Sequence, residues 1–343
     1  MAQVIPFKAA VIGMGAIAPM HIKPLESLGI PIIAVCDTHA EAAQSAAEKI
    51  GAKAYTSLDE MLDAGGFDVL HICLPHYLHA PTAIQALAHG VHVLCEKPMA
   101  TTVADAEKML AAAMENNVYL GIIFQNRYSP GASLIKKTIT SGKLGQPQKG
   151  WLKVTWNRGE NYYRGSDWKG RWDTEGGGAL INQSIHTFDL MNYFLGNPTS
   201  VSGFVANRAN PYIEVEDTAE GMIMYGENGD IPVSFYVTNH HPYNAPATLE
   251  IVFEHGTVTL TGEDAVIAFN DGQKEMAGAD TEAQQQFGMK SYWGVSHIKQ
   301  IRDFYQSLTE GKPPVIDGVE GLRTQRLING IYDSAQSKQR IMF

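Results

Sequence analysis

The chain has 343 residues, of which 45% are hydrophobic and 18% charged, and its formal net charge is -10 at pH 7. This length exceeds what one hydrophobic core usually covers, so we expect two domains. The acidic balance argues against nucleic acid as a partner, because binding to a phosphate backbone needs clustered Lys and Arg. No apolar run is as long as a membrane span, and residues 1–8 lead into a strand without a signal-peptide pattern, so we expect a cytoplasmic protein without membrane contact.

The first part of the chain alternates short apolar runs with helix-like stretches. The runs lack polar alternation, as strands covered on both faces should. This pattern predicts βαβ units and an N-terminal Rossmann domain with a doubly wound parallel sheet over residues 1–125. The predicted strands are 8–12, 32–36, 69–74, 91–95 and 119–124, and the predicted helices are 39–50, 81–89 and 102–116.

After residue 142 the apolar pattern changes to a period of two, which predicts a second, α+β domain over residues 126–343. It has a large open, mostly antiparallel sheet. Its strands are predicted at 148–156, 201–206, 219–225, 231–238, 248–253 and 257–260, and its helices at 178–195, 295–309 and 321–335. A C-terminal helix can pack back on the first domain.

A dinucleotide motif of the form GxGxxA follows the first strand directly, as Gly13-Met14-Gly15-Ala16-Ile17-Ala18. Gly13 permits the tight turn, Gly15 lets the backbone approach a pyrophosphate, and helix N-terminal amides follow at Ala16 and Ile17. The alternative is a glycine-rich turn without ligand.

Asp37 ends the second strand, where a carboxylate can bind both hydroxyls of the adenosine ribose. It would repel a 2'-phosphate, and Thr38-His39 offers no arginine to offset this, so NAD is favoured over NADP. A solvated aspartate at a strand end is the alternative.

Four motifs together resemble the Gfo/Idh/MocA oxidoreductase family, named for glucose-fructose oxidoreductase and inositol dehydrogenase, and most closely its sugar-oxidising members. They are Gly13 to Ala18, Leu74-Pro75-His76-Tyr77-Leu78-His79, Cys95-Glu96-Lys97-Pro98, and the glycine-rich segment that runs from Gly176 to Asp189. The resemblance implies a Rossmann domain followed by an α/β domain, with the active site between them. It also implies a homodimer or homotetramer formed through the C-terminal sheet.

The resemblance also implies a set of cofactor contacts. Pro75, Tyr77 and His79, with Leu74, would line the adenine and nicotinamide-ribose side of NAD. Glu96, Lys97 and Gln125 would lie near the nicotinamide ribose or ring. Arg127 follows the last strand of the first domain and would reach cofactor or substrate.

Oxidation of an alcohol by NAD requires a base within hydrogen-bond reach of the hydroxyl. Lys97 follows a strand at the edge where doubly wound sheets bind ligands. On the predicted helix 178–195, Asn182 and His186 are four residues apart and can contact one substrate, with Asp189 placed to fix the tautomer of His186. The family commonly has aspartate at the position of Asn182, so Asn182 is expected to orient the hydroxyl. Either Lys97 or His186 can be the principal base.

The segment 161–172 is too aromatic and polar for a plain linker. Trp168 and Arg171 could close over the cofactor, and Tyr163 and Trp172 over a sugar. Packing at a domain junction or an oligomer contact is the alternative.

No metal site is predicted. Cys36, Cys73 and Cys95 lie in apolar strands and are expected to be buried, and neither His71, His76 and His79 nor His240-His241 has the spacing of a compact ligand set.

The sequence therefore predicts an NAD-dependent dehydrogenase that moves a hydride between nicotinamide and a ring hydroxyl or ketone of a sugar, glycoside or cyclic polyol. One alternative is an NAD-assisted glycosidase of the same family that uses transient oxidation and elimination. The other is a non-catalytic sugar or dinucleotide sensor, against which Lys97 and His186 argue.

Overall fold

The computed structural model describes residues 5–278 and 296–343 and divides into two compact units. Unit 1 comprises Met1–Ile123 and Ser296–Leu322, and unit 2 comprises Phe124–Val295 and Arg323–Phe343. Val295, the first residue of the predicted helix 295–309, lies outside the described residues, as do residues 1–4.

Unit 1 is built on a parallel sheet of six strands in the order β3-β2-β1-β4-β5-β6. Because β1 and β4 are hydrogen-bonded neighbours although β2 and β3 lie between them in sequence, the sheet changes direction there, as a doubly wound fold requires. The strands are β1 (Ala9–Ile12), β2 (Ile32–Cys36), β3 (Lys53–Tyr55), β4 (Val69–Ile72), β5 (His92–Cys95) and β6 (Leu120–Ile122).

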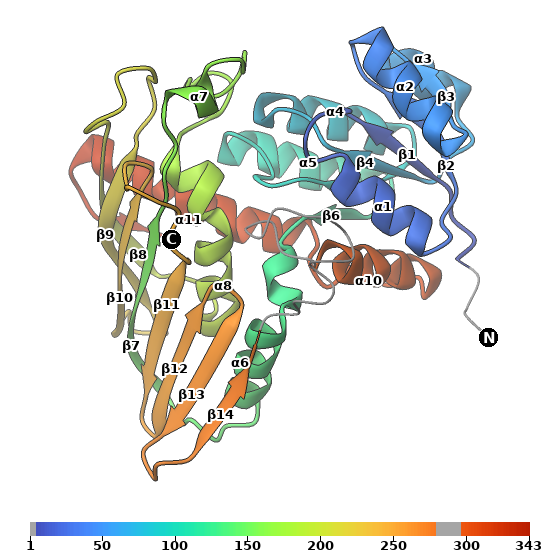
Figure 1. The fold of residues 1–343 in the computed structure, drawn as a ribbon. Coiled ribbons are helices and arrows are strands. Elements are labelled where there is room, and N and C mark those ends of the chain that lie inside the picture. Colours follow the sequence, from blue (N-terminus) through green and yellow to red (C-terminus); the bar gives the residue numbers. More distant parts are fainter. Residues whose placement is uncertain (1–4, 279–295) are drawn as a thin grey trace. The chain divides into compact units, whose positions relative to one another are not determined.

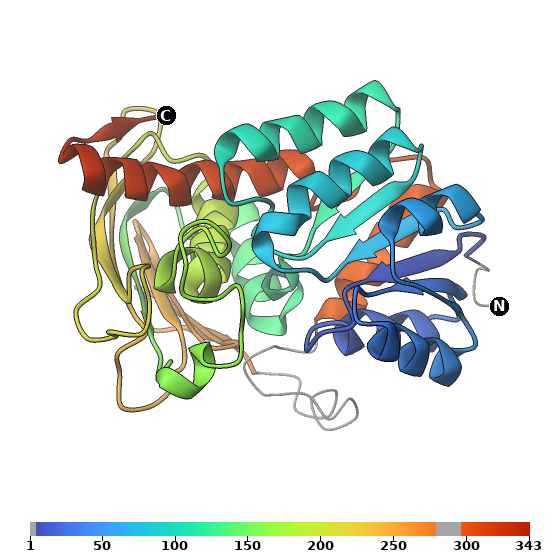
Figure 2. The ribbon, with the colours of Figure 1, turned by 90° about the horizontal axis from the view of Figure 1, so that it is seen from above.

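Helices cover both faces of this sheet, with α4 and α5 on one face and α1, α2 and α10 on the other (Figures 1 and 2). The helices are α1 (Pro19–Ser27), α2 (Ala40–Ile50), α3 (Leu58–Ala64), α4 (His76–Ala88), α5 (Val103–Glu115) and α10 (His297–Thr309). The predicted helix 81–89 was too short, because Pro81 lies inside α4 and not in its first turn.

Unit 2 is built on a mixed, mostly antiparallel sheet of nine strands in the order β14-β13-β12-β11-β7-β10-β9-β8-β15, in which only β7 and β10 are parallel neighbours. The strands are β7 (Pro147–Thr155), β8 (Ser200–Ala206), β9 (Thr218–Tyr225), β10 (Ile231–Thr238), β11 (Thr248–Phe253), β12 (Gly256–Thr261), β13 (Asp264–Phe269), β14 (Lys274–Ala277) and β15 (Ile341–Met342). The predicted fold class is confirmed in both units.

The helices α6 (Pro130–Thr140) and α8 (Ile185–Leu195) pack on one face of this sheet (Figure 1). The shorter elements are η1 (Gln125–Tyr128), α7 (Glu160–Tyr163) and η2 (Ala179–Ser184), and α11 (Gly318–Ser337) contains the boundary between the two units. The predicted α-helix 178–195 is wrong in its first part, because η2 is a π-helix.

Candidate functional site

The glycine turn after β1 lies against the carboxylate of Asp37. The backbone N–H of Met14, between Gly13 and Gly15, donates a hydrogen bond of 2.8 Å to Asp37 Oδ2. The backbone N–H of His39 donates to Asp37 Oδ1, also at 2.8 Å. The carboxylate is therefore held at the C-terminal ends of β1 and β2, where the sequence placed an acceptor for the ribose.

The same turn has room for a dinucleotide. Gly13 has a φ of +89°, and a Cβ atom there would lie 2.5 Å from the carbonyl oxygen of Cys73, so only glycine fits. At Gly15 a Cβ atom would meet no described atom within 4 Å. Ala16 and Ile17 lie in the turn before α1, which begins at Pro19, and a helix N-terminus of this kind favours a bound phosphate. These residues fit NAD, which supplies a hydride acceptor when bound.

The loop after β4 and the first turn of α4 carry the predicted contacts Leu74, Pro75, Tyr77 and His79. Pro75 is the N-cap residue of α4, and the Tyr77 side chain is exposed. His79 is fully buried, with Nδ1 2.7 Å from the carbonyl oxygen of Pro98 and Nε2 2.8 Å from that of Leu74. His79 thus ties this loop to the loop after β5, a positioning role that the sequence did not indicate.

Glu96 and Lys97 follow β5, at the same edge of the sheet as Asp37 and the glycine turn. Glu96 is buried, and its Oε2 accepts a hydrogen bond of 3.2 Å from the backbone N–H of Lys97. Burial raises the pKa of Glu96, but hydrogen bonds from His21 and His297 outweigh it and hold the pKa well below its usual range. An ionised carboxylate therefore directly precedes the predicted catalytic lysine.

In unit 2, Asn182 lies in η2 and His186 in the first turn of α8. The Asn182 side-chain amide donates to Glu175 Oε1 at 2.5 Å and to the Tyr162 hydroxyl at 3.4 Å. The ring of His186 meets the ring of Phe124 edge-on, with centroids 5.9 Å apart. The α-helical spacing from which the sequence placed Asn182 and His186 on one face does not hold across η2.

Asp189, the predicted partner of His186, binds Arg127 and Thr324. Its carboxylate accepts hydrogen bonds from Arg127 Nε at 2.8 Å and Nη2 at 2.6 Å, and from the Thr324 hydroxyl at 3.1 Å. Arg127 and Asp189 form a buried ion pair of the bidentate kind that fixes geometry. A substrate contact of Arg127 stays a prediction. Gln125, in the same η1 element, is buried.

The aromatic segment is folded against unit 2. Tyr163 is buried, and its hydroxyl accepts a hydrogen bond of 3.2 Å from Asn239 Nδ2. Trp172 is 44% exposed and donates from Nε1 to the carbonyl oxygen of Glu214 at 3.0 Å. The carbonyl oxygen of Trp168 accepts from the Thr174 hydroxyl at 2.6 Å, and Arg171 is exposed. These contacts leave Trp172 and Arg171 accessible to a ligand, whereas Tyr163 supports the segment from within.

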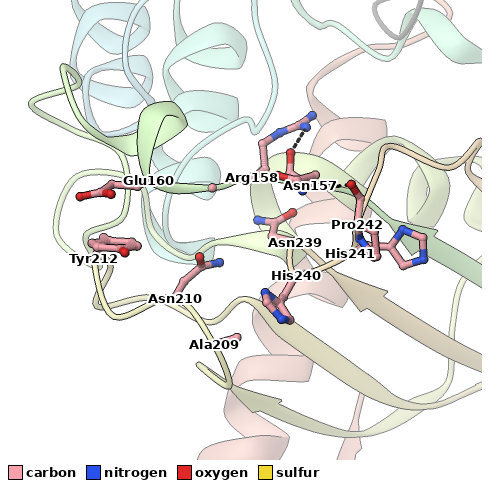
Figure 3. Close-up of a pocket in the computed structure, with 11 residues that line it drawn as sticks. Asn157, Arg158, Glu160, Ala209, Asn210, Tyr212, Asn239, His240, His241 and Pro242 are labelled. Carbon is pink, nitrogen blue, oxygen red and sulfur yellow. Dashed lines mark hydrogen bonds between the residues drawn. The ribbon is translucent and has the colours of Figure 1, made fainter.

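A pocket of about 410 Å³ in unit 2 was missed by the sequence reasoning (Figure 3). It lies where β7 and β10 end, beside the loop between β8 and β9, and its polar lining includes Arg158, Asn210, Asn239, His240 and His241. The signal in the sequence was the paired polar clusters at 157–160 and 239–241, each directly after a strand. The sequence analysis considered His240-His241 only as possible metal ligands.

The pocket wall shares hydrogen bonds with Asn182. Asn239 Nδ2 donates to Gln183 Oε1 at 2.9 Å, and Gln183 Nε2 donates to the Tyr162 hydroxyl at 3.1 Å. That same hydroxyl accepts from Asn182. A polar ligand in this pocket would therefore meet side chains that are fixed relative to Asn182.

Residues 5–278 and 296–343 contain neither a candidate metal cluster nor a candidate membrane-spanning helix. No group of three or more His, Cys, Asp or Glu side chains in these ranges is placed to hold a metal ion. None of their helices is long and apolar enough to cross a bilayer. The three cysteines are buried and free, as expected.

Comparison with known proteins matches the two halves of the chain to two family models. Residues 7–124 match the oxidoreductase family with an NAD-binding Rossmann fold, and residues 136–343 match the C-terminal alpha/beta domain of the same family. Among curated proteins, the chain is 25% identical to the levoglucosan dehydrogenase of Pseudarthrobacter phenanthrenivorans, over 93% of this chain and 91% of that protein. It is 27% identical to the inositol 2-dehydrogenase of Salmonella typhimurium, over 90% of this chain and 87% of that protein.

Among solved structures, the chain is similar to the WlbA dehydrogenase from Bordetella pertussis in complex with NADH and UDP-GlcNAcA. The TM-score is 0.87 and the identity 30%, and the match covers 99% of each chain. The first family model spans the glycine turn and the loop after β5, and the second spans the η2–α8 segment. The chain therefore belongs to the Gfo/Idh/MocA family of oxidoreductases, with an NAD-binding Rossmann domain and the C-terminal α/β domain of that family.

Proposed function

We propose that the chain is an NAD-dependent dehydrogenase that transfers a hydride between nicotinamide and a ring hydroxyl or ketone of a sugar, glycoside or cyclic polyol. Lys97 and His186 are its proton-transfer residues, and Asn182 orients the reacting hydroxyl. One observation carries the proposal: strands β1, β2 and β5 bring the glycine turn, the Asp37 carboxylate and the Glu96-Lys97 pair to the same C-terminal edge of one parallel sheet. In doubly wound folds this edge binds the nucleotide.

The substrate class is supported by the relatives and by the pocket of unit 2. Levoglucosan, inositol and UDP-GlcNAcA in the relatives' names are all hydroxyl-rich rings. A volume of about 410 Å³ suits a small polar ligand. Amide, imidazole and guanidinium groups around it offer both donors and acceptors, as sugar hydroxyls require. Arg158, Asn239 and His240 are therefore proposed as further substrate residues.

The experiment is a substrate panel. Protein, NAD and a series of methyl pyranosides, nitrophenyl glycosides and inositols are mixed, and NADH absorbance and aglycone release are followed together. We expect NADH to accumulate in stoichiometric amounts with the oxidised substrate. Aglycone release without net NADH would reject the dehydrogenase and support the NAD-assisted glycosidase. Ligand binding without either product would support the non-catalytic sensor.

A further inference from the structure

A chain of buried titratable side chains in unit 1 is not used by the proposed chemistry. It runs from Tyr305 of α10 through His71 of β4 and His21 of α1 to Glu96, and His297 of α10 joins it at the carboxylate. Each of these side chains is at most 5% exposed. Burying five polar side chains together is costly unless every one is hydrogen-bonded, so their arrangement needs a reason.

The contacts form one connected line. The Tyr305 hydroxyl lies 2.9 Å from His71 Nε2, and His71 Nδ1 lies 2.8 Å from His21 Nδ1. His21 Nε2 lies 3.1 Å from Glu96 Oε1, and His297 Nε2 lies 3.3 Å from the same oxygen. The line therefore joins α1, the helix that begins at the dinucleotide turn, to the residue that precedes Lys97.

The acceptor at one end fixes the direction of the two hydrogen bonds that reach it. An ionised carboxylate only accepts, so His21 and His297 both donate from Nε2 to Glu96. Burial lowers the pKa of His71 and raises that of Tyr305, so both stay uncharged.

This line of hydrogen bonds is poorly suited to carrying a proton to solvent. Passing a proton along it would leave a phenolate on Tyr305, which is fully buried and whose pKa is raised well above its usual value. A proton relay to solvent is therefore disfavoured, and the arrangement is suited to holding a fixed charge.

Lys97 lies within electrostatic reach of this charge. Its ammonium lowers the pKa of His297 and of His79 by repulsion, after the larger effect of burial. Glu96 also interacts with His79 and with the buried thiols Cys73 and Cys95, and burial raises the pKa of both thiols. Glu96 is thus the anion of this buried cluster.

We propose that His21 and His297, supported by His71 and Tyr305, are positioning residues that hold Glu96 as a fixed anion beside Lys97 and tie it to the cofactor helix. This inference rests on the proposed role of Lys97. A fixed anion stabilises the lysine ammonium and so sets the pH at which Lys97 can accept the substrate proton.

The test compares His21→Leu with His21→Gln, using whichever of methyl β-glucoside or myo-inositol is oxidised. Leucine removes the donor to Glu96, whereas the glutamine amide places an N–H near the position of Nε2. In His21→Leu the buried Glu96 loses a donor and becomes easier to protonate, so Lys97 loses its anion. We expect kcat to fall about 10-fold or more, and the acid limb of the pH profile to move about one unit lower. In His21→Gln both should stay close to wild type.

Two variants keep the test independent of folding. Tyr305→Phe removes one hydroxyl at the far end of the line. It should lower kcat and shift the acid limb of the pH profile in the same direction as His21→Leu, but by less. His92→Leu is the matched control: His92 is in the neighbouring strand β5, and its Nδ1 accepts from the backbone N–H of Tyr119 at 2.9 Å, away from Glu96. This control should lower thermal stability and leave the pH profile unchanged.

Folded His21→Leu with wild-type kcat and pH profile would overturn the inference, as would equal impairment of His21→Gln and His21→Leu. Failure of the proposed function is distinguishable, because then Lys97→Ala would retain wild-type turnover whatever the histidine variants do.

Discussion

At the scale of single residues, we propose that Asp37 decides the choice between NAD and NADP. Its carboxylate is already fixed by the N–H groups of Met14 and His39, so it would face a 2'-phosphate without room to turn away. We expect wild-type protein to use NADP poorly, and Asp37→Ser to raise the ratio of kcat/KM for NADP over NAD by about tenfold or more, because a like-charge repulsion is removed. Steady-state rates with both cofactors measure this.

Asp63→Ser, at an exposed aspartate of α3, is the matched control and should leave the ratio unchanged. Equal wild-type rates with NAD and NADP would reject the assignment of Asp37.

Residues were predictable where local sequence fixes the geometry. Gly13 and Asp37 follow strands directly, so their place at the edge of the sheet could be read from the order of elements. The buried pair of Arg127 and Asp189 could not, because it joins positions 62 residues apart that only tertiary packing brings together. Asn239 and His240 were missed for the same reason, since the pocket forms where β7 and β10 end side by side.

At the scale of elements, the glycine-rich start of η2 depends on Glu216. This buried carboxylate accepts from the backbone N–H of Gly178 and of Leu180, both at 2.9 Å, and from the Tyr332 hydroxyl at 3.0 Å. A Cβ atom at Gly178 would clash with the carbonyl oxygen of Glu216, which explains the glycine. Glu216 therefore fixes the segment that carries Asn182.

We expect Glu216→Gln to lower the free energy of unfolding by about 1–3 kcal/mol, because the new amide faces a backbone N–H with a donor. Burial raises the pKa of Glu216 from 4.5 to about 7. The folded protein thus holds this proton more tightly than the unfolded chain, and that contribution to stability is lost as pH rises from 4.5 to about 7. The stability deficit of Glu216→Gln should therefore be larger at pH 5 than at pH 8, as measured by urea unfolding.

Glu220→Gln is the control for this prediction, since Glu220 is a partly exposed strand residue paired with Arg208. A deficit of Glu216→Gln that is the same at both pH values would contradict the assignment of the proton to Glu216.

Elements were predictable where one pattern dominates. The strands of unit 1 were found because strands covered on both faces are continuous apolar runs. The strands of unit 2 were found because strands buried on one face alternate apolar and polar residues. The π-helical turn of η2 was not, because it depends on Glu216, which lies far along the chain. Helix α6 was missed although Ser129 and Pro130 mark its start, with the Ser129 hydroxyl accepting from the backbone N–H of Ala132 at 3.2 Å.

At the scale of the whole molecule, the sheet of unit 2 carries an exposed apolar face. Phe204 of β8, Met222 of β9 and Tyr236 of β10 are on the same side of the sheet by register and are 53%, 40% and 39% exposed. Neighbouring exposed apolar side chains on a sheet favour association with a second copy. We propose this face, which was predicted from the family resemblance, as the contact of a homodimer or homotetramer.

Phe204→Glu should lower the molar mass measured by light scattering, because it introduces charge into the contact. Met114→Glu, at an exposed residue of α5, is the control and should leave the mass unchanged. A monomeric wild-type protein would refute the proposed contact.

The boundary at residue 125 and the role of each predicted domain stay predictions. The sequence analysis allowed a C-terminal helix to pack back on the first domain but did not say which residues do so; Ser296–Leu322 belongs to the compact unit of the first strands. That assignment depends on contacts such as the one from Gln300 Nε2 to the carbonyl oxygen of Ile122, at 2.7 Å.

The most direct test of the account is the turnover of Lys97→Ala and His186→Ala on the substrate that the panel identifies, with NADH binding followed by its fluorescence. We predict a loss of at least about 100-fold in kcat for Lys97→Ala, because a positioned general base contributes that much, and a clear loss for His186→Ala, while both variants keep the affinity for NADH. Wild-type turnover by Lys97→Ala would contradict the account.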